Sequence, residues 1–140
     1  MKGRIGNIHF FRLRQGEDLL EAIKSRVQKC SVRAGIFLLI GTLKNAVLGY
    51  FKEGRYIPIK LDGPLEIASC IGNVAISEKG EIMVHAHLVV ADEKGGAFGG
   101  HLMNGSIVDV TAELAVIEGA GVSLTRELDE KTGLRLWKTP

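Results

Sequence analysis

A chain of 140 residues with a formal net charge of +2 suits a single domain that buries its own core. Its 46% hydrophobic and 24% charged residues are typical of a globular protein and exclude a low-complexity chain. The small net charge alone does not support nucleic-acid binding, and no apolar run approaches the ~20 residues of a membrane-spanning helix.

The start of the chain, MKGRIGNIHFF, lacks the apolar stretch and cleavage site of a signal peptide. Cys30 and Cys70 form no CxxC pair, which excludes a zinc ribbon or a thioredoxin-type redox site. We therefore expect a soluble, cytoplasmic protein with no membrane partner and two buried thiols.

Residues 6–13, rich in aromatic and branched side chains, predict a strand that ends at Gly16. The following segment changes period and predicts a helix with one apolar stripe, made of Leu19, Leu20, Ile23, Val27 and Cys30. Glu17 and Asp18 lie in the first turn and Arg26 and Lys29 near the end, an arrangement of charges that is favourable to the helix dipole. We expect the stripe to face the core.

From Arg33 onward the sequence predicts strands joined by short turns, in the segments 34–43, 45–51, 55–61, 63–76, 82–91 and 106–117. Residues 45–51 and 55–61 flank a glycine turn and indicate a hairpin. Residues after 118 predict only a further short strand or turn of helix. The pattern predicts an α+β domain, a mostly antiparallel sheet with one or two helices packed on it.

Some of these strands are apolar on both faces, and one helix cannot cover both faces of a wide sheet in so small a chain. Exposed apolar patches usually mark interfaces, so subunit association is expected to cover the remainder.

Three of the four histidines lie in one short region. His85 and His87 alternate within a strand, so they point to the same face with Cα atoms about 6.5 Å apart. His101 follows the DEKGG turn, and a hairpin would return it beside the strand it left. Gly99 and Gly100 precede it and would allow unusual dihedrals or a close approach. Three histidines with a fourth open position are the pattern of an open zinc site.

Two alternatives remain open for these residues: a divalent-metal site in a dry surround, or histidines that satisfy hydrogen bonds at a subunit contact. His9 stands apart and is expected to be structural. Glu66 lies in an otherwise apolar strand, where a buried carboxylate needs a partner at a pocket or an interface. Glu113 shares one strand face with Asp109 and Thr111, facing a pocket or water, and Val110 is expected on the opposite face.

Several separated motifs resemble the PPC family, the plants and prokaryotes conserved domain. They are FRLRQGEDLLEAI, AGIFLLIGTLKNAVLGYF, GPLEIASCIGNVAI, HAHLVVAD and GGHLMNGSIVDVTAEL, which occur in the family's order over residues 4–118. The resemblance implies one compact α+β domain over residues 1–140, with 119–140 as a C-terminal extension, and a homotrimer. It also implies a metal site at the HxH and GGH positions, here His85, His87 and His101.

Plant members of that family carry AT-hook motifs that grip A·T-rich DNA, and this chain has no RGRP core. The minor-groove mechanism therefore does not transfer, and DNA binding by the domain surface should be weak and salt-sensitive. Three functions follow in order of preference. The first is a trimeric binding protein with a zinc or other divalent-metal site, the second a stand-alone DNA-binding protein. The third is a metal-dependent enzyme acting on a small molecule with Glu66 or Glu113 as its base.

Overall fold

The structure, a computed structural model, describes residues 1–138 as one helix and eight strands. The helix is α1 (Leu19–Lys29), and the strands are β1 (Arg4–Arg14), β2 (Gly35–Lys52), β3 (Arg55–Ser77), β4 (Ile82–Ala91), β5 (Ala97–Leu102), β6 (Ile107–Ala120), β7 (Thr125–Leu128) and β8 (Arg135–Trp137). The predicted α+β class is therefore confirmed, with one short helix. That helix is too short to cross a membrane, and the described residues contain no longer one.

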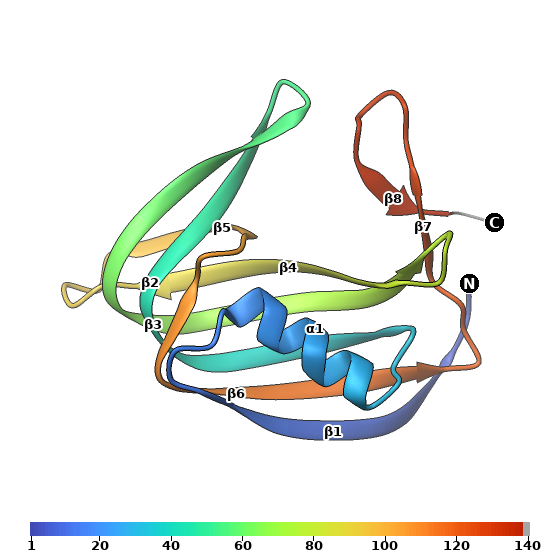
Figure 1. Cartoon of the computed structure of the whole chain (residues 1–140), viewed down its shortest axis with the longest axis horizontal. Helices are drawn as coiled ribbons and strands as arrows, with labels where there is room; N and C mark the ends of the chain where they lie inside the picture. Colours follow the sequence, from blue (N-terminus) through green and yellow to red (C-terminus); the bar gives the residue numbers. More distant parts are fainter. Residues whose placement is uncertain (139–140) are drawn as a thin grey trace.

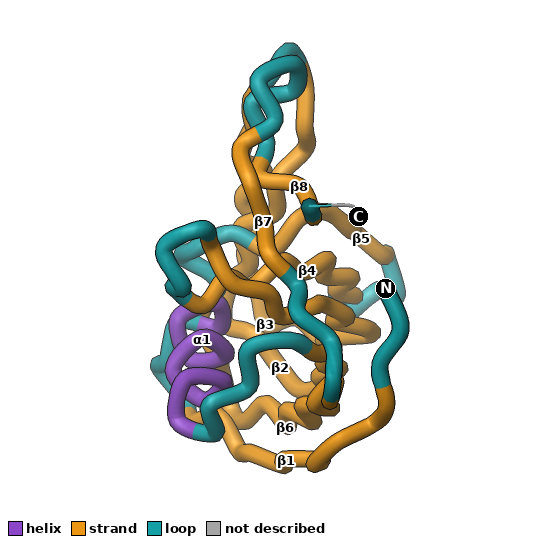
Figure 2. The backbone as a smooth tube through the Cα atoms, turned by 90° about the vertical axis from the view of Figure 1, so that its right-hand side faces the viewer, coloured by secondary structure: helices purple, strands orange, loops and turns teal. Residues whose placement is uncertain are grey.

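The strands form one sheet in the order β1-β6-β2-β5-β4-β3-β7-β8, with β2 also paired to β3. All pairings are antiparallel except a two-residue parallel contact between β3 and β7. Because β2 pairs with three different strands along its length, the sheet curls around the core. Helix α1 lies across one face of this curled sheet (Figures 1 and 2).

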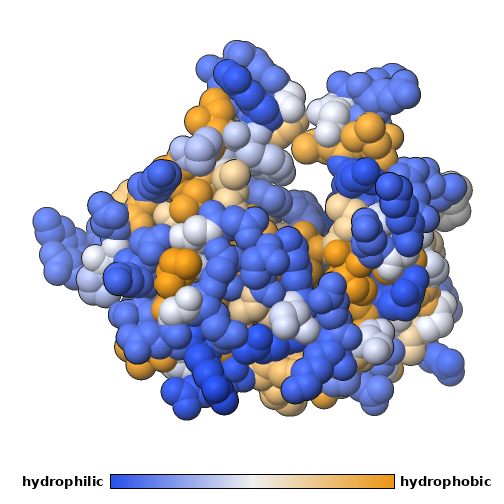
Figure 3. All heavy atoms as spheres, in the orientation of Figure 1, coloured by the Kyte–Doolittle hydropathy of each residue, from blue (hydrophilic) through white to orange (hydrophobic). Residues whose placement is uncertain are grey.

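Helix α1 begins where the side chain of Asp18 accepts a hydrogen bond from the Glu21 backbone, as an N-cap should. Its predicted apolar stripe packs on the sheet, with Leu19, Ile23 and Val27 fully buried. Its outer face is hydrophilic (Figure 3). Of the two cysteines, both unpaired, Cys70 is buried as expected, whereas Cys30 is only half-buried.

The four segments predicted as separate strands between residues 34 and 76 are two long strands, β2 and β3. The interruptions expected near residues 44 and 62 are register irregularities within a continuous ladder, where the backbone stays extended. The predicted hairpin is confirmed at Glu53 and Gly54, whose φ angles of 51° and 78° are those that a two-residue hairpin turn requires. This hairpin projects from the body of the domain (Figure 1).

One face of the sheet carries apolar side chains that no other part of residues 1–138 covers. Direct register partners on this face run from Phe10 through Ala115, Leu38 and Ile71 to His87. Phe10, Leu38 and Ile71 are 77%, 49% and 62% exposed. We call this row, with the flanking Ile36 and Ile40, the outer apolar face. It is the uncovered surface that the sequence predicts for β2.

The prediction that Val110 shares a face with Val108 is wrong. Val108 is buried, whereas Val110 is 62% exposed. The pairing of β6 with β2 shifts between Ala112 and Val108, and the Val110 backbone N–H donates to the Thr42 side chain instead of the ladder. The extra residues form a bulge, which breaks the strict alternation that the sequence suggests.

Candidate metal centre

Strands β4 and β5 bring the three histidines together. His87 and His101 are direct register partners in the β4–β5 hairpin, so the turn returns His101 as the sequence predicts. The ring centroids lie 5.4 Å apart for His85 and His87, 5.1 Å for His85 and His101, and 5.9 Å for His87 and His101. One nitrogen from each ring lies within 4.8 Å of one from both others. Three imidazoles therefore converge on one point.

The glycines before His101 act through close approach and not through unusual dihedrals. Neither Gly99 nor Gly100 has a positive φ. A Cβ on Gly100 would lie 3.1 Å from both the Gly49 carbonyl oxygen and Leu48 Cβ, so a side chain there would push β5 away from β2. Gly99 has more room, with Val89 3.3 Å from a Cβ. Gly100 thus keeps β5 close enough to β2 to position His101.

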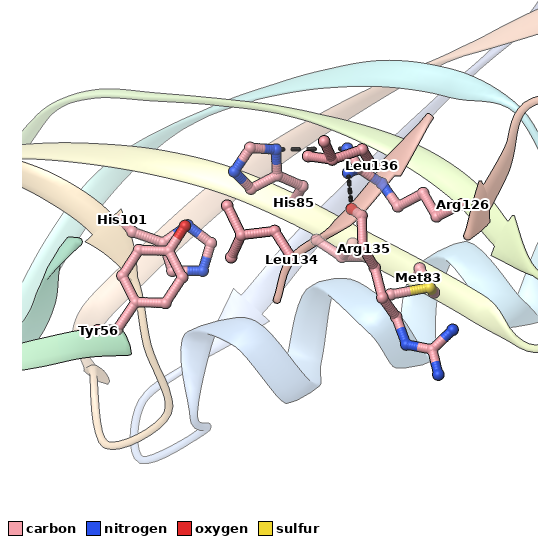
Figure 4. A pocket seen from close by; sticks show the side chains of 9 residues that line it. Tyr56, Met83, His85, His101, Arg126, Leu134, Arg135 and Leu136 are labelled. Carbon is pink, nitrogen blue, oxygen red and sulfur yellow. Dashed lines mark hydrogen bonds between the residues drawn. The ribbon is translucent and has the colours of Figure 1, made fainter. Parts of the chain in front are cut away.

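Two neighbours of the histidines come from segments that the sequence did not connect with them. Tyr56, at the start of β3, stacks on the His101 ring with centroids 4.3 Å apart. Arg126, on β7, donates a hydrogen bond from Nη2 to His85 Nδ1 at 3.3 Å (Figure 4). Arg126 is 7% exposed, and its Nη2 also donates to the Asn73 side chain at 2.9 Å. No sequence motif indicates that either residue belongs to the site, because a long-range strand pairing determines the position of each.

His85 and His101 line a cavity of about 230 Å³ between the two projecting hairpins, and His87 lies outside its lining. Its lining residues are Tyr56, Met83, Val84, His85, His101, Arg126, Leu134, Arg135 and Leu136. The β2–β3 and β7–β8 hairpins stand on either side of this hollow (Figures 1 and 3). The C-terminal segment therefore forms one wall of the site.

The surroundings of His85 and His101 favour the neutral imidazole, the form that binds metal, because they lower the pKa of both rings. Burial, together with the charges of His85, His87 and Arg126, lowers the pKa of His101 to about 4. Burial also lowers the pKa of His85, with Arg126 and His87 as additional causes. At neutral pH both rings are deprotonated and carry a lone pair for a cation.

These pKa shifts predict the pH dependence of stability in the metal-free protein. The unfolded His101 takes up a proton near pH 6.5, whereas the folded ring does so only near pH 4. The contribution of the His101 ring to the free energy of unfolding is therefore fully present above pH 6.5 and is lost as the pH falls toward 4. Because the ring is partly solvent-exposed, we expect a loss of about 1–2 kcal/mol from this group. Urea unfolding at pH 7 and pH 4 measures it.

The matched control for this pH effect is His101→Gln, which removes the titrating ring. The variant should lose about 1–2 kcal/mol less stability than the unmodified chain between the two pH values. Equal losses in both proteins would contradict the assignment to His101.

The residues of the cluster fit a zinc ion. His101 Nδ1 is buried and has no hydrogen-bond partner in the described chain. A buried polar atom without a partner is costly, and a metal–nitrogen bond would satisfy it. Three histidine nitrogens are a ligand set that zinc accepts, with a fourth position left for another ligand. No carboxylate is among the described residues that line the cavity, so a purely oxygen-binding cation such as Ca²⁺ fits less well.

The other residues singled out from the sequence lie elsewhere. Glu66 is exposed and not buried, so the expectation of a buried carboxylate is wrong. Glu113 lies beside Phe10 and Leu38 on the outer apolar face, away from the cavity. His9 stacks on Phe11, with ring centroids 6.4 Å apart. Neither carboxylate is thus placed to act as a base at the histidines.

The dry surround expected for the histidines also needs correction. In the single chain His87 is exposed, on the outer face of the sheet. His85 is half-buried against the polar side chains of Arg126 and Asn73. The rings project from the same strand face as Val89, but this face is turned away from the core, which lies on the side of Ala86 and Leu88.

Comparison with known proteins identifies similar chains of the same size. The Plants and Prokaryotes Conserved (PCC) domain matches residues 1–120. A plant- and prokaryote-conserved (PPC) protein from Pyrococcus horikoshii is 39% identical, with a TM-score of 0.91 over 99% of this chain and 96% of that one. A metal-containing protein from Archaeoglobus fulgidus is 31% identical, with a TM-score of 0.89 over 99% of this chain and 97% of that one.

Two further comparisons are less direct. The chain is 30% identical to the bifunctional protein GlmU of a Synechococcus strain over 90% of its own length, but it spans only 19% of that protein. A protein from Bacteroides thetaiotaomicron, described as a candidate for DNA binding, is 21% identical with a TM-score of 0.86 over 96% of this chain and 94% of that one. This last likeness shows a shared fold.

Proposed function

Since the chain belongs to the Plants and Prokaryotes Conserved domain family, we propose that it is a homotrimeric binding protein that holds zinc through His85, His87 and His101. The observation that carries the proposal is the convergence of three histidine nitrogens within 4.8 Å, one ring having a buried nitrogen without a partner. The described metal content of the Archaeoglobus protein supports it.

The roles of the individual residues follow from their contacts. His87 and His101 would hold the ion from paired positions of the β4–β5 hairpin, and His85 from the same face of β4. Tyr56 holds the His101 ring by stacking, and Gly100 keeps its strand close to β2. Bound zinc supplies positive charge and one open coordination position to a ligand in the cavity.

The test is zinc content in the protein without a histidine tag, because a tag would bind metal itself. Metal-free protein dialysed against a small excess of zinc should retain one ion per chain, and a chelator should remove it. Protein that stays essentially metal-free under these conditions would overturn the proposal. Cobalt or manganese retained in preference to zinc would overturn the identity of the metal.

The outer apolar face supports the proposed trimer. Burying apolar surface contributes about 25 cal/mol per Å², and Phe10, Leu38 and Ile71 leave much of theirs in water in a single chain. We propose that further copies of the same chain cover this face. His87 is a register neighbour of Ile71 in this row, so association would also bury His87 and dry the metal site.

DNA binding is the second candidate, favoured by the exposed Arg4, Arg12 and Arg14 along β1. A trimer would gather three copies of this strand and gain avidity. With a net charge of only +2 per chain, we expect micromolar or weaker binding that falls steeply with salt. Fluorescence anisotropy with a DNA duplex at 20 and 200 mM salt measures it. Absence of binding at the lower salt would exclude this function.

A further inference from the structure

Arg126 is buried beside the histidines with part of its hydrogen-bonding capacity unused. Its Nη1 donates to the Arg135 carbonyl oxygen at 2.7 Å, and its Nη2 donates to Asn73 Oδ1 and His85 Nδ1. Its Nε is buried and has no partner in the described chain. The guanidinium lines the cavity (Figure 4). A buried cation with an unpaired N–H destabilises the fold unless a ligand accepts a hydrogen bond from that N–H.

The hydrogen bond from Arg126 to His85 cannot persist when His85 binds metal. A guanidinium only donates, so His85 Nδ1 accepts and the proton of the neutral ring is on Nε2. If Nδ1 binds the metal, its lone pair is no longer available. If Nε2 binds the metal, the proton of the neutral ring moves to Nδ1, which then cannot accept. In both cases metal binding releases one N–H of Nη2.

Nε–H and one N–H of Nη2 lie on the same edge of the guanidinium, because Nε–H and Nη2 are on one side of the group. Two parallel N–H groups match the two oxygens of a carboxylate. Arg135 also lines the cavity, but its side chain is tied to Glu78 at 3.3 Å. Arg126 is therefore the side-chain cation left for a ligand among the described lining residues.

We propose that the cavity binds a small organic monocarboxylate between Arg126 and the metal, and that metal and carboxylate strengthen each other's binding. The inference rests on the proposed zinc site and names the class of its ligand. Apolar side chains of Met83, Leu134 and Leu136 form the wall for a short hydrocarbon tail. Metal binding frees the Arg126 edge, and a bound carboxylate keeps Arg126 from competing for His85.

This coupling is reciprocal. If zinc raises carboxylate affinity by a given factor, the carboxylate must raise zinc affinity by the same factor. Titration of butyrate into zinc-loaded and zinc-free protein by calorimetry measures the first factor, and a chelator competition with and without butyrate measures the second. We expect both to be at least about tenfold. Butyramide, which has the same shape without the charge, should not bind.

The single tryptophan provides a separate optical readout. Trp137 lies with its ring centroid 5.6 Å from Arg126 Cζ, so a shift of the guanidinium changes its surroundings. Zinc addition should therefore change tryptophan fluorescence, with a further change when butyrate is added. An unchanged signal through both additions would overturn the release of Arg126.

The variants are Arg126→Lys and, as the matched control from the same cavity, Arg135→Gln. Arg126→Lys keeps the positive charge but lacks the two parallel N–H donors of the guanidinium. It should therefore retain zinc and lose the zinc-dependent butyrate binding. Arg135→Gln should retain both. Circular dichroism at 280–300 nm, dominated by Trp137, checks that the β7–β8 hairpin of each variant stays folded.

The outcomes separate the two proposals. Failure to bind zinc overturns the zinc site and this inference together. Zinc binding without a zinc-dependent affinity for butyrate overturns the inference alone. Zinc-dependent binding of inorganic phosphate in preference to butyrate overturns the carboxylate assignment, and butyrate binding unaffected in Arg126→Lys overturns the role of Arg126.

Discussion

His87→Ala will reduce bound zinc from one ion per chain to a trace and weaken zinc binding by more than about 100-fold. Loss of a hydrogen-bonding partner around a metal ligand costs 10- to 100-fold, and loss of a ligand itself should cost more. His87 is the most informative of the three ligands because it is exposed in the single chain, so its removal disturbs little packing. Elemental analysis and chelator competition measure the effect.

His9→Ala is the matched control, since His9 is the one histidine outside the cluster. This variant should keep full zinc content. The same zinc affinity in His87→Ala and in the unmodified chain would show that the three rings do not act as one site. Because His87 also adjoins the outer apolar face, light scattering should accompany the measurement to separate metal loss from dissociation.

The second large effect is expected on assembly. Leu38→Glu should convert the protein from a particle of three chains into single chains of 15.2 kDa. Leu38 lies in the middle of the outer apolar face and is 49% exposed, so a single folded chain can solvate the new carboxylate. In a trimer assembled through this face each new carboxylate would be buried without a partner, which would strongly destabilise the assembly. Light scattering gives the mass directly.

Leu128→Glu is the control for this variant. Leu128 is an apolar residue with 56% exposure, on β7 near the opposite edge of the sheet. It should leave the mass unchanged. A monomeric unmodified chain, or a trimer that persists in Leu38→Glu, would contradict the proposed interface.

The elements that the sequence predicts well are those determined by local pattern. The apolar stripe from Leu19 to Val27 predicts a helix that packs one face against the core, and the structure confirms this prediction. The alternation of His85 and His87, with a glycine turn before His101, places three rings on one side of a hairpin. Here the strand period and the turn suffice, because all three residues lie within one supersecondary unit.

Features that depend on distant pairing were not predictable. Arg126 reaches His85 because β7 pairs with β3 through a two-residue parallel contact. The periodicity of the sequence does not predict this pairing. Tyr56 reaches His101 because β2 and β3 continue as long strands beyond the points where they were expected to end. Glu66 was expected to be buried because its neighbours are apolar, but alternation turns it to the outer face.

The most direct test of the metal site is a crystal structure of the zinc-loaded protein with anomalous data collected on both sides of the zinc absorption edge. The proposed site predicts one anomalous peak per chain, within about 2.0–2.1 Å of a nitrogen of His85, His87 and His101. A map from fully loaded crystals in which the peak lies elsewhere, or in which the three rings have turned apart, would contradict it.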